Sequence, residues 1–195
     1  MIVGVPKEIK NNEYRVGLTP KSVDEITSIG HDVYVENNAG FEIGYTNQDY
    51  IESGAKIINS AEEVYKSSEL IVKVKEPLSS EFNFINKDNI LFTYLHLAGN
   101  KDESIELAKT GVTGIAYETV TSDDGSLPLL SPMSSIAGQL SIIVGSYNLL
   151  KHNNGKGTLL GNVSSLEPRV ITVIGAGVAG TEAIKKAQIG RAHVW

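Results

Sequence analysis

Three glycines stand between two segments of opposite character near the end of the sequence. An apolar, β-branched run from Val170 to Ile174 is followed by the spacing G-x-G-x-x-G, and a helix-forming run then continues to Ala187. Gly175 permits a tight turn, Gly177 leaves room for a pyrophosphate close to the backbone, and Gly180 lets the helix pack closely on the strand. The new helix would point its free N–H groups and positive dipole end at the phosphates. The pattern predicts a dinucleotide-binding turn, and a plain packing turn is the alternative.

The turn is close to the last residue of the sequence. Such a turn is normally followed, about 20 residues further on, by an Asp or Glu that binds the ribose hydroxyls. The sequence ends at Trp195, before that position, which leaves the choice between NAD and NADP open. Because a complete nucleotide-binding unit needs further strands, we expect this unit to be truncated.

Three side chains in the first half of the sequence could act on a small anionic substrate. Arg15 follows the first apolar run, Lys75 directly follows Val74, and His96 lies just past Tyr94. Ligands of open parallel sheets collect beyond the carboxyl ends of the strands. There, Arg fits a carboxylate, Lys polarises a carbonyl and His exchanges a proton near neutral pH. The set would suit a small 2-oxo acid, and the alternative is two solvated charges with a structural histidine.

Runs of strand length alternate with helical patterns before residue 120, which predicts a parallel, doubly wound sheet. The expected strands are Ile2–Val5, Asp32–Glu36, Leu70–Val74, Ile90–Tyr94 and Val112–Ala116. Helices are expected from the cap Thr19 with Pro20 to Ile29, from the cap Asn47 to Gly54, from the capping box Ser60–Glu63, and over about Lys101–Lys109.

A segment rich in Ser, Asp, Gly and Pro, residues 121–132, reads as a linker between two domains. The longest helical pattern follows, with an apolar stripe formed by Ile136, Leu140, Val144, Tyr147 and Leu150. The fold class predicted is therefore α/β, with two doubly wound, Rossmann-like units of which the second is truncated. The boundary is placed between residues 128 and 129.

Composition excludes several classes of function. The net charge is −6, 21% of residues are charged and no basic block occurs, so we expect no nucleic-acid partner. Without cysteine there is no disulfide framework or thiolate site, and no metal site is expected. The first residues reach charge too early for a signal peptide, and polar residues interrupt the most apolar stretch, Ile136–Leu150. A cytoplasmic protein without a membrane segment is the expectation.

Several sequence blocks occur in one order around these candidate residues. They are Gly4–Glu8, Glu13–Pro20, Val72–Pro77, Leu95–Ala98, Ala116–Thr119, Leu129–Ser134 and the glycine turn. Together they resemble the alanine dehydrogenase family, in register from Met1 to about Ala187. The nearest relative within that family is the α-subunit of nicotinamide nucleotide transhydrogenase. That subunit lacks the block around His96, so the resemblance favours alanine dehydrogenase.

The resemblance implies NAD-dependent oxidative deamination of L-alanine to pyruvate and ammonium, and the reverse reaction. By matching position, Arg15 and Lys75 would bind the substrate, and His96 would donate or accept a proton. Glu118, a loop carboxylate beside a strand end, is interpreted as solvated.

The resemblance also assigns residues to the cofactor. Ser134 and Met133 would lie beside NAD at the domain boundary, and Val178 and Ala179 would offer backbone contacts to the pyrophosphate, together with the three glycines. An alternative role for Ser134 is the N-cap of the long helix.

Parts of the family's active site have no counterpart in the sequence. A second acid–base aspartate and the C-terminal helices of the substrate domain would lie beyond Trp195. We therefore expect an N-terminal fragment that is inactive alone, from an enzyme that is a homo-oligomer, a hexamer in the family, when full length. A nucleotide-binding module without catalysis and a transhydrogenase subunit are the alternative functions.

The last residues depart from the family's pattern. Residues 189–194 read Ile-Gly-Arg-Ala-His-Val, which is also one translation of a common sequencing-library adapter. We favour an adapter origin for residues 188–195, and ordinary divergence in a helix-to-strand turn is the alternative.

Overall fold

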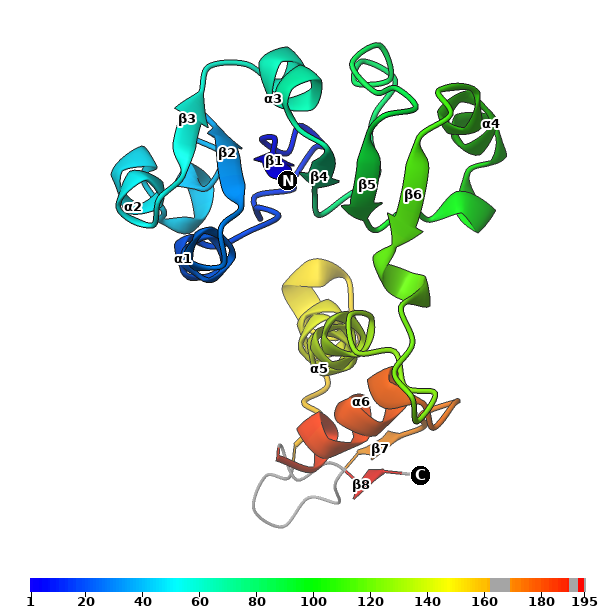
Figure 1. Ribbon diagram of the computed structural model, residues 1–195. Helices are drawn as coiled ribbons and strands as arrows, with labels where there is room; N and C mark the ends of the chain where they lie inside the picture. Colours follow the sequence, from blue (N-terminus) through cyan, green and yellow to red (C-terminus); the bar gives the residue numbers. More distant parts are fainter. Residues whose placement is uncertain (162–168, 190–192, 195) are drawn as a thin grey trace. The chain divides into compact units, whose positions relative to one another are not determined.

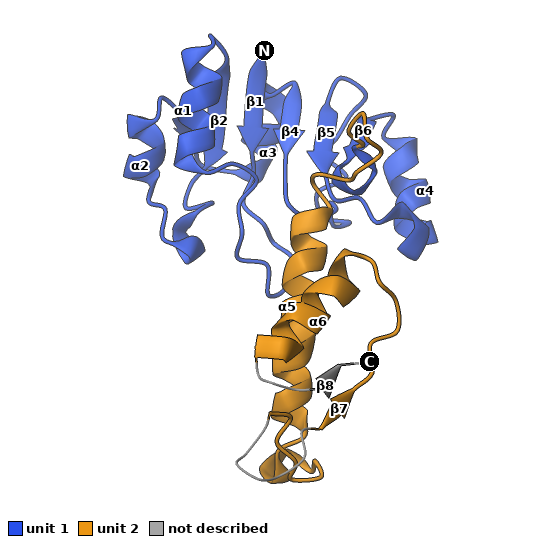
Figure 2. Cartoon of the chain, turned by 90° about the horizontal axis from the view of Figure 1, so that it is seen from below, with its two compact units in different colours: residues 1–120 blue, residues 121–195 orange. Residues whose placement is uncertain are grey.

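The chain forms two compact units, residues 1–120 and 121–195 (Figure 2). The structure, a computed structural model, describes residues 1–161, 169–189 and 193–194. The first unit ends where segment 121–132, predicted as a linker, begins, eight residues before the boundary predicted at 128/129.

The first unit is built on a six-stranded parallel sheet in the order β3-β2-β1-β4-β5-β6 (Figure 1). The chain runs outward from β1 to β3 and then returns to β4, on the other side of β1. A switch point therefore lies between β1 and β4, where ligands of such sheets usually bind. The strands are β1 (Ile2–Val5), β2 (Asp32–Glu36), β3 (Lys56–Ile58), β4 (Leu70–Val72), β5 (Ile90–Thr93) and β6 (Thr113–Ala116).

Four strands of the first unit differ from the prediction. β5 ends at Thr93 and not at Tyr94, and β6 begins at Thr113 and not at Val112. No pattern in the sequence predicted β3, which has only three residues and begins with a lysine. The predicted strand to Val74 stops at Val72. Just beyond this end, the N–H of Val74 donates to the carboxylate of Glu8 at 2.6 Å.

The helices of the first unit are α1 (Pro20–Ser28), α2 (Asn47–Glu52), α3 (Ala61–Ser67) and α4 (Lys101–Lys109), with short 3₁₀ turns η1 (Phe41–Ile43), η2 (Leu97–Gly99) and η3 (Tyr117–Thr119). The predicted cap of α1 is confirmed, because Thr19 accepts a hydrogen bond from Ser22 N. Ser60 accepts from Glu63 N at the start of α3, which confirms the cap but forms only one of the two bonds of the predicted capping box.

The predicted cap of α2 is wrong. Thr46, not Asn47, is the N-cap, and it forms a reciprocal capping box with Asp49. Asn47 is the first helical residue, and its side chain instead bonds Asn37 and the backbone N–H of Asn38. A threonine followed three residues later by an acid satisfies two helix N–H groups at once, which a single Asn does not.

Two hydrophobic clusters cover the sheet, and alternate strand residues contribute to them. Val5 and Val35 pack with α1 and α2 in one cluster, whereas Ile71 and Leu91 pack with α3 and α4 in the other. Gly4 lies under α3, where a Cβ would stand 2.8 Å from Val64 Cγ1. The central strands are thus buried on both faces, whereas the edge strand β6 is largely exposed.

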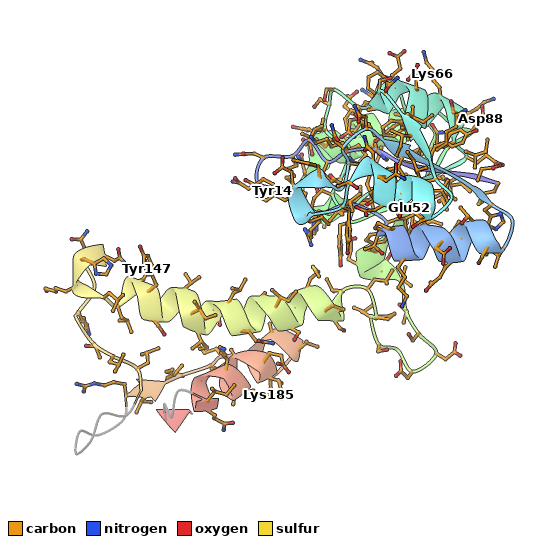
Figure 3. All side chains as sticks on the ribbon, turned by 90° about the vertical axis from the view of Figure 1, so that its left-hand side faces the viewer. Tyr14, Glu52, Lys66, Asp88, Tyr147 and Lys185 are labelled. Carbon is orange, nitrogen blue, oxygen red and sulfur yellow. The ribbon has the colours of Figure 1, made fainter. Side chains whose placement is uncertain are left out.

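The second unit contains α5 (Ser131–Asn148), η4 (Lys151–Asn153), β7 (Val170–Ile171), α6 (Val178–Ile189) and β8 (His193–Val194). β7 and β8 are parallel neighbours, and β7 is shorter than the predicted run to Ile174. Helix α5 packs on α6 at Gly138, the buried residue of α5. Side chains along the predicted apolar stripe of α5 are about half exposed, and Figure 3 shows Tyr147 near the end of this helix.

Among the residues that the structure describes, none of the helices combines the length and hydropathy needed to cross a membrane.

Candidate functional site

Lys75 and His96 meet at the carboxyl edge of the first unit's sheet. Lys75 follows β4 and His96 follows the neighbouring strand β5, and Lys75 Nζ lies 3.0 Å from His96 Nε2. An ammonium has donors but no acceptor, so in this contact the Lys75 ammonium donates and His96 Nε2 accepts. The structure thus places side by side two residues that are 21 positions apart in the sequence.

Arg15 lies in the loop after β1, next to the switch point. Its Nε and Nη2 donate to the two carboxylate oxygens of Glu13, at 2.8 and 2.6 Å. These bonds hold the pKa of Glu13 below its usual range. Glu13 therefore stays ionised and fixes the plane of the guanidinium.

Tyr94 connects Arg15 with His96. Its ring is stacked on the His96 ring, with centroids 5.9 Å apart and planes 10° apart. Burial raises the pKa of Tyr94, and the nearby charge of Arg15 partly offsets that rise. Lys75, His96 and Tyr94 thus form one cluster by contact, and the charge of Arg15 acts on Tyr94 within it.

A buried charge network beneath this cluster was missed by the sequence analysis. Lys73 is fully buried, and its Nζ lies 2.9 Å from Glu81 and 3.4 Å from Glu8. Tyr65 also donates to Glu81, while Glu8 accepts the backbone N–H groups of Val74 and Lys75. Desolvation by burial raises the pKa of Glu8. In an extended strand, residues two positions apart lie on the same face, so the spacing Lys-Val-Lys does not reveal that Lys73 is buried while Lys75 reaches His96.

Glu118 is not the solvated side chain that the sequence analysis expected. Its carboxylate accepts the backbone N–H of His96 at 2.7 Å and that of Leu95 at 3.2 Å. The sequence around Glu118 carries no sign of this contact, because the donor N–H groups lie in the loop after β5, the neighbouring strand.

A cavity of about 440 Å³ opens beside His96. It is lined by residues 96–99 and by Ala116, Glu118 and Thr119. His96 and Glu118 therefore border a space large enough for a small organic acid.

The glycine turn of the second unit has the geometry that its spacing predicts. Gly175 has a φ of +102°, which favours glycine. A Cβ on Gly180 would stand 1.9 Å from the carbonyl oxygen of Gly175, whereas a Cβ on Gly177 would meet no atom within 4 Å. The turn is thus tight at Gly180 and open at Gly177, where a phosphate would approach. Because α6 begins at Val178, the N–H groups of Val178 and Ala179 have no partner within the helix.

Ser134 and Met133 lie in the first turn of α5. Ser134 is not the N-cap, since α5 begins at Ser131 and Leu130 occupies the cap position. Ser134 is one turn before Gly138, whose Cβ position is 2.1 Å from the carbonyl oxygen of Ala179. Within the second unit, Ser134 is therefore on the face of α5 that contacts the start of α6.

Comparison with known proteins identifies the family. The model described as "Alanine dehydrogenase/PNT, N-terminal domain" matches residues 4–137. The chain belongs to the alanine dehydrogenase/PNT family. The family's C-terminal domain model matches residues 141–195.

Relatives in this family resemble the chain along nearly its whole length. It is 50% identical over 187 residues to the alanine dehydrogenase of Methanococcus maripaludis, and 47% identical over 194 residues to that of Mycolicibacterium smegmatis. These alignments cover 96% and 100% of the chain. The chain spans about half the length of these relatives, 50% and 52%.

Solved structures from this family share the fold. A structure titled L-alanine dehydrogenase matches with a TM-score of 0.90 and 48% identity, covering 98% of the chain and 53% of the other. The crystal structure of transhydrogenase from Sinorhizobium meliloti matches with a TM-score of 0.81 and 28% identity, covering 100% of the chain and 55% of the other.

The unusual tail is only partly covered by the structure. Residues 190–192 and 195 lie outside the described residues. The pairing of β8 with β7 is what the helix-to-strand alternative expects of residues 193–194. The adapter origin stays a prediction.

Proposed function

We propose that the complete protein oxidises L-alanine with NAD and water, giving pyruvate, ammonium, NADH and a proton, and that it also runs the reverse reaction. The observation that carries the proposal is the contact between Lys75 and His96 at the carboxyl edge of β4 and β5. The 48% identity to a solved L-alanine dehydrogenase supports it.

The cluster supplies the groups that this substrate needs. Arg15, whose guanidinium is oriented by Glu13, offers a fixed positive charge to the substrate carboxylate. Lys75 offers a positive charge to the oxygen or nitrogen on Cα, where charge develops during the reaction. His96 can take a proton during oxidation and return it in the reverse direction.

The second unit fits a dinucleotide. The N–H groups of Val178 and Ala179 and the open approach at Gly177 would hold the pyrophosphate, with Gly175 and Gly180 shaping the turn. We assign Ser134 and Met133 to the same cofactor. When bound, NAD accepts the hydride from the substrate Cα.

The proposal extends to the domains and the assembly. Residues 1–128 would form the substrate domain, and residues 129–195 would begin the NAD-binding Rossmann domain. The complete protein would act as a homo-oligomer, as the family resemblance implies. The match to a transhydrogenase structure makes hydride exchange between nicotinamide nucleotides the second candidate function.

The test measures NADH absorbance with purified complete gene product, L-alanine and NAD. Formation of NADH is expected to depend on alanine, and His96→Ala should lower kcat by about 10²–10⁴-fold because a proton-transfer group is lost. His31→Ala, which changes a histidine just before β2, is the matched control and should keep wild-type activity.

Two results would contradict the proposal. If exchange between nicotinamide nucleotides is seen without any response to alanine, the transhydrogenase function is favoured instead. Saturable NADH binding without turnover would indicate a nucleotide-binding module.

A further inference from the structure

The backbone at His96 has a conformation that residues other than glycine rarely adopt. Its φ and ψ are 49° and 33°, in the left-handed region. Here the chain turns from β5 into η2, and the N–H of Gly99 donates to the carbonyl of His96 at 2.9 Å. Such a conformation persists only where surrounding contacts hold it.

One carboxylate, that of Glu118, holds this turn. Glu118 Oε1 accepts the N–H of His96 at 2.7 Å and the N–H of Leu95 at 3.2 Å, and Oε2 lies 3.3 Å from Leu95 N. Two successive N–H groups that converge on one anion form a concave anion-binding turn. We propose that Glu118 is a positioning residue for His96, a role that rests on the proposed function of this site.

Glu118 is itself held on a rigid support. It lies in η3, directly after the edge strand β6. The ring of its neighbour Tyr117 meets the Phe92 ring edge-on at 4.3 Å and the Tyr94 ring at 5.1 Å. Since Tyr94 also stacks on His96, the same aromatic group fixes both the carboxylate and the imidazole that it positions.

The partner of His96 is fixed by separate contacts. The carbonyl of Lys75 accepts from Thr93 Oγ1 at 2.9 Å, and its N–H donates to Glu8. Lys75 is thus anchored by β5 and by the loop after β1, without Glu118. Loss of Glu118 is therefore expected to move His96 away from a Lys75 that stays in place, breaking the 3.0 Å contact.

The experiment compares Glu118→Gln, Glu118→Ala and Glu118→Asp. Gln keeps a carbonyl oxygen that can accept both N–H groups but has no charge, whereas Ala has no acceptor and Asp is one methylene shorter. Two readouts are used: hydrogen exchange of the Leu95 and His96 amides in this chain, and kcat and KM for alanine in the complete gene product. Glu106→Ala, on the exposed face of α4, is the matched control.

If Glu118 positions His96, Glu118→Gln should behave differently from Glu118→Ala and Glu118→Asp. Glu118→Ala and Glu118→Asp should speed exchange of the two amides and lower kcat by about a hundredfold, with a smaller change in KM, because a displacement of about 1 Å costs that much. Glu118→Gln should restore amide protection and most of kcat. Glu106→Ala should change neither readout.

Other results would overturn the proposal. If Glu118→Gln loses as much kcat as Glu118→Ala while both amides stay protected, Glu118 acts through its charge and not by positioning. Unchanged amide exchange in Glu118→Ala would also refute it. If the wild-type protein forms no NADH with alanine, the proposed function fails, while the amide measurements still decide whether Glu118 holds His96.

Discussion

Two lysines separated by a single valine occupy opposite environments in this chain. Lys73 is fully buried between Glu8 and Glu81, whereas the side chain of Lys75 is 21% exposed and contacts His96. The buried lysine compensates two carboxylates that cannot reach water. Lys75 is held beside His96 because the backbone N–H groups of Val74 and Lys75 donate to the carboxylate of Glu8.

Replacing the buried lysine should be far more costly than replacing the exposed one. Lys73→Met leaves Glu8 and Glu81 as uncompensated buried charges, so the free energy of unfolding should fall by about 3–5 kcal/mol. Lys75→Met removes a charge whose side chain is partly exposed, and it should cost less than about 1 kcal/mol. Urea denaturation of the two variants at pH 7 measures the difference, and equal losses would refute the network.

The stability of Lys73→Met is expected to depend on pH. Burial already raises the pKa of Glu8 above 4.5, and loss of the Lys73 charge raises it further. Between the pKa of Glu8 in the unfolded chain and its raised pKa in the folded variant, folded Lys73→Met binds more protons than the unfolded chain. The free energy of unfolding of this variant therefore falls as pH rises. The deficit relative to wild type should therefore shrink on acidification toward pH 4.5.

Residue types alone predicted only part of the candidate site. Arg15, Lys75 and His96 were selected because each follows a strand, and the structure brings Lys75 and His96 into contact. Glu118 was interpreted as solvated because a loop carboxylate carries no local sign of the N–H groups that bind it. Those N–H groups lie in another strand's loop, 22 residues away.

At the scale of elements, helix boundaries were predicted where local chemistry fixes them. Thr19 with Pro20 starts α1, and α4 spans Lys101–Lys109 as expected. Strand ends were less predictable. Just after β4 ends, the N–H of Val74 donates to Glu8, a residue 66 positions away whose contact the local sequence does not reveal. The apolar stripe of α5 indicated a helix but not which face another element covers.

The crossing of α5 and α6 depends on a glycine. A Cβ at Gly138 would stand 2.1 Å from the carbonyl oxygen of Ala179, whereas a Cβ at Gly145 would meet no atom within 4 Å. Gly138→Ala should therefore destabilise the second unit by about 1–3 kcal/mol through overpacking. Gly145→Ala, in the same helix, should stabilise it by about 0.5–1 kcal/mol.

Thermal unfolding followed by circular dichroism separates the two variants of α5. Opposite shifts in Tm are expected, because only one of the added methyl groups meets backbone. A stabilising Gly138→Ala would contradict the close crossing of the two helices.

At the scale of the whole molecule, the alternation of strands and helices predicted a parallel sheet, and the first unit confirms it. The strand order was not predictable, because no local pattern states that β4 pairs with β1 and not with β3. That pairing joins the loop bearing Arg15 to the strand that precedes Lys75. The site therefore depends on long-range packing that the sequence shows only indirectly.

The second unit exposes much apolar surface in this chain. Ile136, Ile143 and Val144 are each about half exposed on α5, and Ile174 is 97% exposed. We expect the 195-residue chain to self-associate with rising concentration and to lack saturable NADH binding, because large apolar patches favour association. Val144→Glu should reduce the mass measured by light scattering after size exclusion.

A matched substitution controls for charge. Phe41→Glu changes an apolar side chain of the first unit that is 61% exposed, and it should leave the association unchanged. A chain that stays monomeric over the concentration range, or that binds NADH saturably, would contradict this expectation.

The carboxylate that holds His96 also sets an order of events during protein synthesis. Glu118 follows His96 by 22 residues, and at about 5–20 residues per second the ribosome adds it about one to four seconds later. During this interval the two N–H groups at Leu95 and His96 have no carboxylate to bind. Codons that slow translation between these positions would lengthen the time for which the nascent chain carries an unfinished turn at His96.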